Sequence, residues 1–420
     1  MFSTWGALTG LAVAIVLIVR RTAPAYALVA GALIGGLVGG GGLVDTVGAM
    51  ISGAQSMMPS VLRILTSGVL AGALVKTGSA EKLADAIVRA IGSRFALAAI
   101  ALATMIVTAV GVFVDIAVIT VAPVALAVGR RAALPVSALL VAMVGGGKAG
   151  NVISPNPNTI AVADAFHLEL TDLMAKNIMP ALCALVVAAL VSAWVARRER
   201  GSVAHCGDEG DAKPTGGGRP CLIAALAGPV AVVAILALRP VCGFAVDPLV
   251  ALPAGGLASI FACGAWRKTA AYCEYGLSKV IGVSILLIGT GAVAGIIKNS
   301  GLNSDMIALL AACKLPAFAL APLSGVLLSG ATASTTAGVT IAAQTFSGAL
   351  AEAGVPALSA AAMLHAGGTM FDALPHGSFF HATAGAVGIG VKERLRLFPY
   401  GTLVGLTTTL SATAMYLLFK

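Results

Sequence analysis

The sequence predicts an all-α polytopic membrane protein made of two inverted-topology repeats. Hydrophobic residues make up 59% of its 420 residues and charged residues 10%, with a mean hydropathy of +0.99, a composition that excludes a soluble domain. Apolar runs recur along the chain, and crossing a hydrocarbon core takes about 20 helical residues. The second half repeats the hydrophobic layout of the first, which is typical of transporters with internal repeats.

Six apolar runs in each half define the expected membrane elements. They are 5–19, 23–42, 59–75, 95–128, 135–144 and 173–195 in the first half, and 221–238, 248–266, 281–297, 315–350, 356–371 and 397–419 in the second. We therefore divide the chain into a first membrane repeat (1–196), a polar cytoplasmic linker (197–219) and a second, inverted repeat (220–420).

One run in each half is too long for a single crossing. The run 95–128 has Arg94 before it and Arg130 after it, so we expect a re-entrant hairpin that enters and leaves on the cytoplasmic side, with its tip at 111–116. The matching run 315–350 is expected to enter from the outside, with its tip at 329–336. Each repeat then crosses the membrane five times, and the odd number makes the two repeats antiparallel.

The net charge of +9 is interpreted as a topology signal. No basic face with interleaved aromatic residues is present, which argues against a nucleic-acid partner. Basic residues mark cytoplasmic loops, and the linker is the richest basic segment. We expect a multi-pass protein of the inner (cytoplasmic) membrane of a bacterium, with a cytoplasmic linker and both termini extracytoplasmic. The basic positions 20–21, 130–131, 267–268 and 392–396 would then also lie inside.

An apolar helix breaks at the same place in each half. Glycine pairs at 146–147 and 367–368 precede polar, proline-containing stretches at 151–159 and 372–378. Glycine and proline often do no more than kink membrane helices. Two broken helices at matching positions, however, indicate a transport site.

Polar residues at the breaks and hairpin tips are the predicted substrate ligands. Lys148, a lone lysine at membrane depth, is suited to bind a substrate carboxylate or to pair with Asp115. The hydroxyl and amide side chains supply neutral donors and acceptors, although Ser and Thr in membrane helices often bond to their own turn. The predicted set is Lys148, Asn151, Ser154, Asn156, Asn158, Thr159, Thr332, Ser334, Thr335, Thr336 and Ser378.

Asp115, His365, Asp372 and His376 are the predicted ion-coupling residues. An intramembrane carboxylate such as Asp115 indicates a proton carrier or a cation ligand, unless backbone N–H groups satisfy it. The two histidines and Asp372 suit a proton relay. A metal site is the weaker interpretation because H-E-x-x-H is absent and the spacing is irregular. The seven cysteines lack C-x-x-C spacing, and we predict no cofactor.

Three segments give the chain a family resemblance. VFVDIAVITVAP at 112–123 is similar to a hairpin of the gluconate:proton symporter (gluconate permease) family, within the ion transporter superfamily. ISPNPNTIA at 153–161 resembles that family's proline-rich break, and SGATASTT at 329–336 resembles its second hairpin tip. FDALPHGSFF at 371–380 departs from the family's Ser-His-x-Asn-Asp-Ser-Gly-Phe-Trp pattern, which indicates a divergent branch.

The resemblance implies proton-driven symport of a small hydroxycarboxylate, such as gluconate or a related acid, by a homodimer. Related superfamily members use Na⁺, so the sequence leaves the coupling ion open. A channel is the second class of function considered, but a channel needs no antiparallel duplication with two broken helices. A membrane enzyme with Asp115 and Asp372 as an aspartyl protease pair would need a Gly-x-Gly-Asp context, which is missing. We therefore predict a secondary active transporter that works by alternating access, and no catalytic residues.

Overall fold

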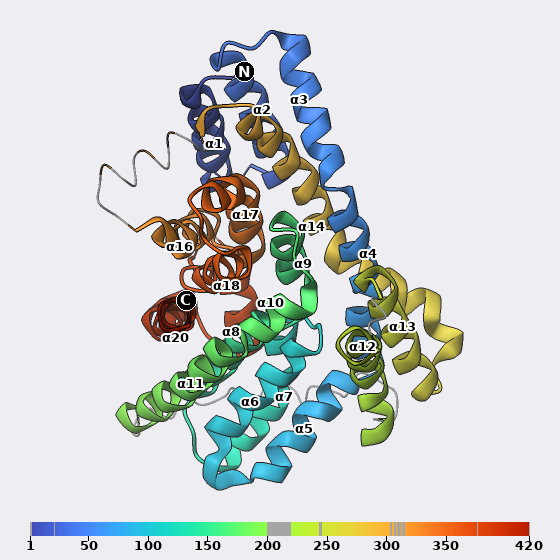
Figure 1. The fold of residues 1–420 in the computed structure, drawn as a ribbon. Helices are drawn as coiled ribbons and strands as arrows, with labels where there is room; N and C mark the ends of the chain where they lie inside the picture. Colours follow the sequence, from blue (N-terminus) through green and yellow to red (C-terminus); the bar gives the residue numbers. More distant parts are fainter. Residues whose placement is uncertain are drawn as a thin grey trace.

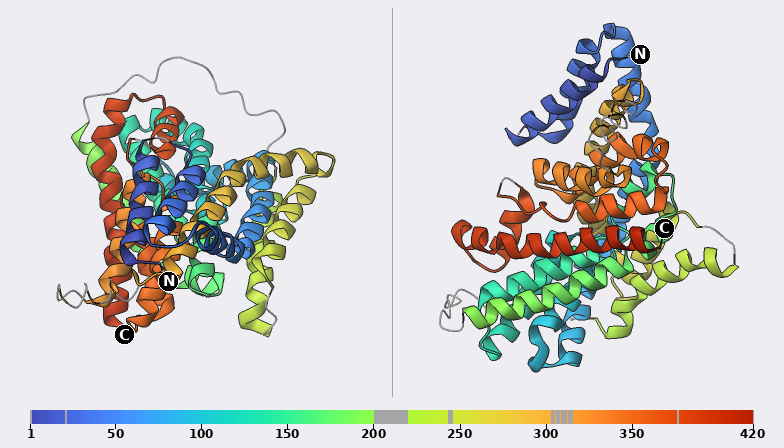
Figure 2. Two further views of the ribbon diagram at one scale, coloured as in Figure 1. Left: turned by 90° about the horizontal axis from the view of Figure 1, so that it is seen from above. Right: turned by 60° about the vertical axis from the view of Figure 1, so that its left-hand side comes forward.

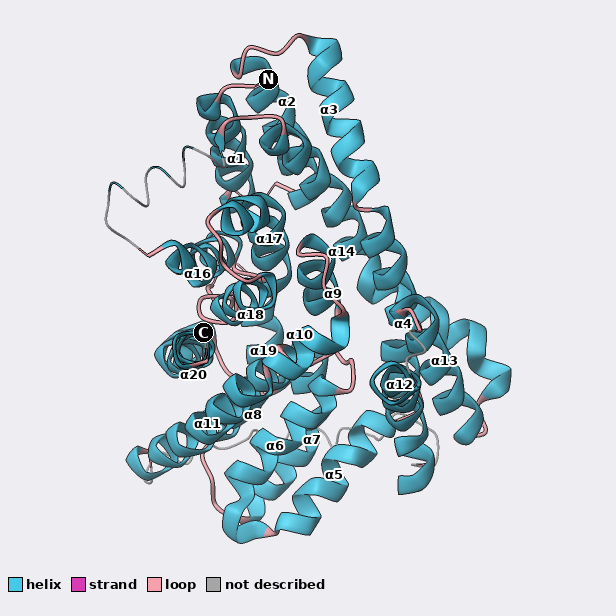
Figure 3. Cartoon of the chain, in the orientation of Figure 1, coloured by secondary structure: helices cyan, strands magenta, loops and turns pink. Residues whose placement is uncertain are grey.

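The computed structural model is built of helices (Figures 1 and 3). It describes residues 2–20, 22–199, 220–242, 246–302, 305, 308, 312, 316–375 and 377–419. The predicted linker therefore lies almost wholly outside the described residues, as does His376. Within the described part, the β-structure amounts to a single bridge between Phe2 and Ser300.

The first half consists of four helices, a short amphipathic helix, a helical hairpin, a broken helix, a short helix and a long final helix. They are α1 (Thr4–Val19), α2 (Pro24–Val38), α3 (Leu43–Ser56), α4 (Met58–Lys76), α5 (Ser79–Ile91), α6 (Ala96–Ala109), α7 (Val114–Arg131), α8 (Val136–Asn151), α9 (Pro157–Ala165), α10 (Leu170–Lys176) and α11 (Ile178–Arg198).

The second half follows a similar order of long helices, hairpin, broken helix and final helix. Its helices are α12 (Leu222–Cys242), α13 (Pro248–Ala262), α14 (Thr269–Lys298), α16 (Leu320–Thr332), α17 (Thr335–Glu352), α18 (Ala357–Gly367), α19 (Ser378–Ala386) and α20 (Val391–Leu418).

Four described segments are long and apolar enough to cross a membrane. They comprise α4, α11, the segment Trp266–Lys298 that contains α14, and α20. In α11 the buried positions include Ala181, Ala184 and Ala188, whereas large residues such as Leu190 and Trp194 are exposed. Small residues toward neighbouring helices and large apolar residues outward are the pattern of helices packed in lipid, where close backbone contact stabilises the bundle. This protein is therefore a multi-pass membrane protein.

The helices form two groups, which we call the frame and the body. The frame consists of α1–α4 and α12–α14, in which α14 packs on α2, α3 and α4, and α13 packs on α4 and α12. The body consists of α6–α11 and α16–α20, in which α8 packs on α6 and α11, and α18 packs on α16 and α20. Figure 1 and the right-hand view of Figure 2 show α1–α3 of the frame extending away from the body.

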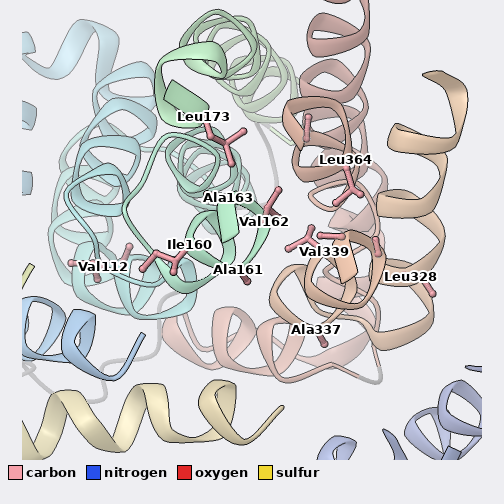
Figure 4. Close-up of a cluster of buried hydrophobic side chains, with 14 of the residues drawn as sticks. Val112, Ile160, Ala161, Val162, Ala163, Leu173, Leu328, Ala337, Val339 and Leu364 are labelled. Carbon is pink, nitrogen blue, oxygen red and sulfur yellow. The ribbon is translucent and has the colours of Figure 1, made fainter. Parts of the chain in front are cut away.

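Helix α9 lies between the two halves of the body. Its residues from Pro157 to Ala163 are buried, and it packs against α17 and α18 of the other half. Figure 4 shows Ala161 and Val162 of α9 near Val339 of α17, within the hydrophobic core. Because α9 begins at the first break, this packing fixes the position of the polar residues at its start.

Arg63 on α4 links the frame to the body. Its guanidinium forms a bidentate interaction with Asp247, with Nη2 2.6 Å from Oδ2 and Nε 3.0 Å from Oδ1. It also forms an ion pair with Asp164 on α9, and Ser60 donates a hydrogen bond to the same carboxylate. Asp247 additionally caps α13 by accepting the backbone N–H of Leu249. Bidentate arginine–carboxylate pairs are geometrically specific, so this cluster fixes α9 relative to α4 and α13.

The glycine pairs that precede the breaks have a packing role. A Cβ added at Gly146 would collide with the carbonyl oxygen of Ala101 on α6. A Cβ added at Gly367 would collide with the carbonyl oxygen of Pro322 on α16. Each broken helix thus lies against the first arm of its hairpin at a glycine, where the backbones touch.

We expect Gly146→Ala and Gly367→Ala each to lower the free energy of unfolding by about 1–3 kcal/mol, because overpacking forces the helices apart. The measurement is thermal unfolding in detergent. Gly385→Ala is the matched control, since in the described structure nothing lies within 4 Å of a Cβ at that position of α19. Melting temperatures at the wild-type value for both variants would contradict this packing.

Candidate substrate-binding cavity

A cavity of about 870 Å³ lies where the helix breaks and hairpin tips meet. Four helices present their first residues to it: α7 (Val114, Asp115), α9 (Asn158), α17 (Thr335, Thr336, Ala337) and α19 (Ser378, Phe379). Nine residues predicted from the sequence line it, namely Asp115, Asn151, Asn158, Thr332, Ser334, Thr335, Thr336, Asp372 and Ser378.

The first hairpin places Asp115 in the first turn of α7. The hairpin turns between Val110 and Phe113, and Gly111 has a φ of +109°, a backbone conformation that a side chain rarely adopts. Oδ1 of Asp115 accepts the backbone N–H of Ile116 at 2.9 Å. Lys279 on α14 lines the same cavity and attracts the Asp115 carboxylate electrostatically. Asp115 is thus held at the helix N-terminus and faces a cation of the frame.

At the first break, three asparagines bind one another. Oδ1 of Asn151 accepts Nδ2 of both Asn156 (2.7 Å) and Asn158 (2.9 Å). Oδ1 of Asn156 caps α9 by accepting the N–H groups of Asn158 and Thr159. Asn156 and Thr159 therefore satisfy the broken backbone, and they do not line the cavity.

Ser154 also serves the fold. Its hydroxyl donates to the carbonyl oxygen of Thr108 on α6 at 2.7 Å, and it does not line the cavity. Nδ2 of Asn151, by contrast, is buried without a hydrogen-bond partner among the described residues, although Asn151 lines the cavity. Of the residues predicted at this break, Asn151 and Asn158 are the two that reach the cavity.

The tip of the second hairpin connects the two halves of the body. Ala333 has a φ of +47°, and Ser334 caps α17 by accepting the N–H of Ala337. The hydroxyl of Thr336 donates to Oδ1 of Asn158 at 2.5 Å, and that of Thr335 donates to Oδ2 of Asp372 at 2.7 Å. The start of α17 is thereby bonded to both breaks.

Lys148 forms a buried ion pair with Asp372. Its Nζ lies 2.6 Å from Oδ1 of Asp372 and donates to the carbonyl oxygen of Thr369 at 2.6 Å. The two side chains are 1% and 4% exposed. The sequence suggested Asp115 as an ionic partner for Lys148, and the structure replaces it with Asp372 of the second break. Asp372 lines the cavity and Lys148 does not, so the carboxylate separates the ammonium group from the cavity.

The remaining predicted coupling residues do not assemble into a relay in the described structure. His365 is fully buried in α18, does not line the cavity, and neither ring nitrogen has a hydrogen-bond partner among the described residues. His376 lies outside the described residues. No group of three His, Cys, Asp or Glu side chains in the described part is arranged to hold a metal ion.

Sequence reasoning missed three basic residues. Lys279 and His381 line the cavity, and Nε2 of His381 bonds to the carbonyl oxygen of Pro375 at 2.8 Å. Arg394 was interpreted as a loop marker, but it is 2% exposed in the first turn of α20. For Lys279 the available signal was a lysine at the edge of a long apolar run. Nothing local distinguishes Arg394 from its neighbours Lys392 and Arg396.

The cavity lining combines groups that can bind an anion with two carboxylates. Helix N-termini carry partial positive charge and unsatisfied N–H groups, so they bind carboxylates and phosphates. Four of them open onto one cavity, together with the Lys279 ammonium and the His381 ring. Asp115 and Asp372 are the carboxylates in the lining, and Lys148 already neutralises Asp372.

Comparison with known proteins decides the family. The model of the GntP family permeases matches residues 4–419. The chain belongs to this family. An uncharacterized transporter of Haemophilus influenzae is 50% identical to this permease over 418 residues, which are 100% of this chain and 99% of the relative. An uncharacterized permease of the same organism is 26% identical over 196 residues, 46% of this chain and 40% of the relative.

A solved structure supports the fold of this GntP family permease. The crystal structure of the Alcanivorax borkumensis YdaH transporter aligns with a TM-score of 0.70 and 16% identity, over 89% of this chain and 88% of that chain. At this identity the likeness concerns the fold alone. The permease is a membrane transporter and not an enzyme.

The buried ion pair of this permease predicts an unequal response to single and double substitution. Lys148→Met leaves the Asp372 carboxylate buried without its ionic partner, which we expect to cost about 3–5 kcal/mol of unfolding free energy. The double variant Lys148→Met/Asp372→Asn removes both charges and should recover most of that loss. Thermal unfolding of the purified variants measures the difference, and a double variant as unstable as Lys148→Met would show that the pairing is not the cause.

Proposed function

We propose that this permease is a secondary active transporter that couples the entry of a proton to the uptake of a small organic (hydroxy)carboxylate by alternating access. The observation that carries the proposal is the convergence of four helix N-termini on one cavity that also contains Lys279 and His381. A cavity of about 870 Å³ has room for a hydroxy acid of several carbons together with water. Nδ2 of Asn151 and the Ser378 hydroxyl are neutral donors, and the Thr336 oxygen is an acceptor, that suit the hydroxyl groups of such an acid.

The proposal includes two inverted repeats with re-entrant hairpins. The matched order of hairpin (α6–α7, α16–α17), broken helix (α8–α9, α18–α19) and long final helix supports it. So does the glycine contact that each broken helix makes with its own hairpin. Body helices of both repeats supply the site, and we propose that the body moves relative to the frame during transport. A homodimer joined through the frame is part of the proposal and rests on the family resemblance.

We further propose that the described conformation opens toward the cytoplasm. The cavity lining includes residues from Thr22 to Ala25, in the connection between α1 and α2, directly after the basic pair at 20–21. Because basic loops are typical of the cytoplasmic side, we propose that this mouth of the cavity lies inside and both termini lie outside. The Arg63 cluster joins the C-terminal end of α9 to the N-terminal end of α13. It would then lie on the extracytoplasmic side and close the cavity there.

Topology is tested by cysteine labelling. In a background without other cysteines, Phe419→Cys, exposed at the end of the chain, should react with a membrane-impermeant maleimide in intact cells. The native Cys221, exposed just before α12, should react only after the membrane is opened. The reverse pattern would overturn the orientation.

Transport is tested in proteoliposomes loaded at one pH and diluted into another. The candidate acids are gluconate, glycerate, lactate, 3-hydroxybutyrate, citrate and D-serine, first ranked by the rise in melting temperature that each gives the purified protein, since a ligand of the folded state stabilises it by mass action. A proton symporter accumulates its acid when the outside is more acidic. Accumulation that follows an imposed Na⁺ gradient instead would make the alternative, Na⁺-coupled carboxylate transport, the correct assignment. No accumulation of any acid under either gradient would contradict the proposal.

Asp115 is the proposed coupling group of the first hairpin. Asp115→Asn mimics a permanently protonated carboxyl group, so it should abolish accumulation driven by a pH gradient, while exchange of internal for external substrate, which moves no net proton, persists at a reduced rate. Asp45→Asn is the matched control, because Asp45 is exposed at the start of α3. Full pH-driven accumulation by the folded Asp115→Asn variant would remove Asp115 from the mechanism.

A further inference from the structure

We propose that the Asp372 side chain substitutes for the carboxylate of the substrate. Asp372 pairs with Lys148 whenever the carrier holds no substrate. A proton on Asp372 breaks this ion pair, and the carboxylate of the substrate takes its place on Lys148. The inference rests on the proposed function, and it adds the order of events and a second titrating group, Asp372, that links substrate binding to protonation.

The position of the ion pair makes access to Lys148 depend on Asp372. The side chain of Lys148 is 1% exposed and does not line the cavity, whereas Asp372 does. No anion in the cavity can therefore reach Nζ of Lys148 while the Asp372 carboxylate stays 2.6 Å from it. Substrate binding at this lysine requires Asp372 to leave.

The surroundings of the Asp372 carboxylate carry the second step. Oδ1 faces Nζ of Lys148, and Oδ2 accepts the hydroxyl of Thr335 at the N-terminus of α17. An ammonium group, a hydroxyl donor and a helix N-terminus are the groups that bind a carboxylate of any origin. A substrate carboxylate fits the same three partners.

The charges around the pair carry the third step. Arg394 of α20 is 2% exposed and is close enough to attract Asp372 electrostatically. Its Nε donates to the hydroxyl of Thr383, its guanidinium lies 5.3 Å from the centre of the Phe380 ring, and Nη2 has no hydrogen-bond partner in the described structure. Two buried cations thus interact with the Asp372 carboxylate, Lys148 in direct contact and Arg394 at longer range.

Protonation of Asp372 would leave Lys148 and Arg394 without a counter-charge in a buried site, which is costly unless another anion enters. The other charged or titratable groups that line the same cavity as Asp372 are Asp115 of α7, Lys279 of α14 and His381 of α19. The proton and the substrate anion therefore favour each other's binding. Such coupling is reciprocal, since whatever the proton adds to substrate affinity the substrate adds to proton affinity.

The inference predicts how binding depends on pH. Only carriers with protonated Asp372 bind, so the apparent Kd should rise about tenfold for each pH unit once that form is the minority. Asp372→Asn cannot hold Lys148 by charge and carries no titrating proton. It should bind the acid with a Kd that is independent of pH and at least as low as the wild-type Kd at acidic pH.

The experiment measures the Kd of the acid that gives the largest thermal shift in the screen above, between pH 5.5 and 8.5, on the purified full-length protein. Asp45→Asn, at an exposed position at the start of α3, is the matched control and should keep the wild-type dependence on pH. If the Kd of Asp372→Asn depended on pH as the wild-type Kd does, or if the folded variant did not bind the acid, the inference would be overturned. If wild-type protein binds none of the acids, it is the proposed function that fails.

A second variant covers the case in which Asp372→Asn does not fold because Lys148 keeps an unpaired charge. The double variant Lys148→Met/Asp372→Asn removes both charges, and it should fold but bind the acid at least about tenfold more weakly, as expected for a lost charge-assisted hydrogen bond. Wild-type affinity in the folded double variant would show that the substrate does not use Lys148, and would overturn the inference.

Discussion

The architecture of this permease depends on the cost of placing a charge in a membrane interior. Lys148 has almost no exposed surface and therefore needs a counter-charge, which Asp372 supplies from the other half of the chain. That one requirement brings the first broken helix against the second. It also sets the position of α17, because Thr335 binds the same carboxylate. A buried pair is only marginally favourable as a stabilising element, but it is strongly unfavourable to break. It is therefore well suited to hold two states apart in a transport cycle.

The broken helices create a second constraint, since each interruption leaves backbone N–H and carbonyl groups without helical partners in a region that lacks bulk water. Nearby side chains bind several of these backbone groups. Asn156 caps α9, Ser334 caps α17, and Ser154 binds a carbonyl oxygen of the neighbouring hairpin. The first residues of α7, α9, α17 and α19 line the cavity. The same interruptions that cost stability thus place four helix N-termini at the cavity, which the proposed anionic substrate would use.

Frame and body differ in how they are joined. Within the body, glycine contacts and small residues bring backbones together over long stretches, as between α8 and α6 or α18 and α16. Between frame and body, the Arg63 cluster contributes polar bonds to Asp164 and Asp247, and Lys279 of the frame faces Asp115 across the cavity. Polar bonds in a partly exposed site exchange with water more readily than close-packed backbones separate. The proposed movement of the body against the frame would break these polar bonds and the packing of α14 on α17, and it would keep the glycine contacts within the body.

The sequence by itself determined the membrane class, the helix ends at the breaks and tips, and nine of the residues that line the cavity. These properties follow from hydropathy, glycine, proline and capping side chains, which act within a few residues of chain. The tertiary structure decided that Lys148 pairs with Asp372 and not Asp115, that Ser154, Asn156 and Thr159 serve the fold, and that Arg394 is buried. It also brought Lys279 and His381 into the lining. Such outcomes depend on which face of a helix packs against a helix from the other half of the chain. Packing across the whole body decides this, and sequence patterns that span only a few residues do not contain that information.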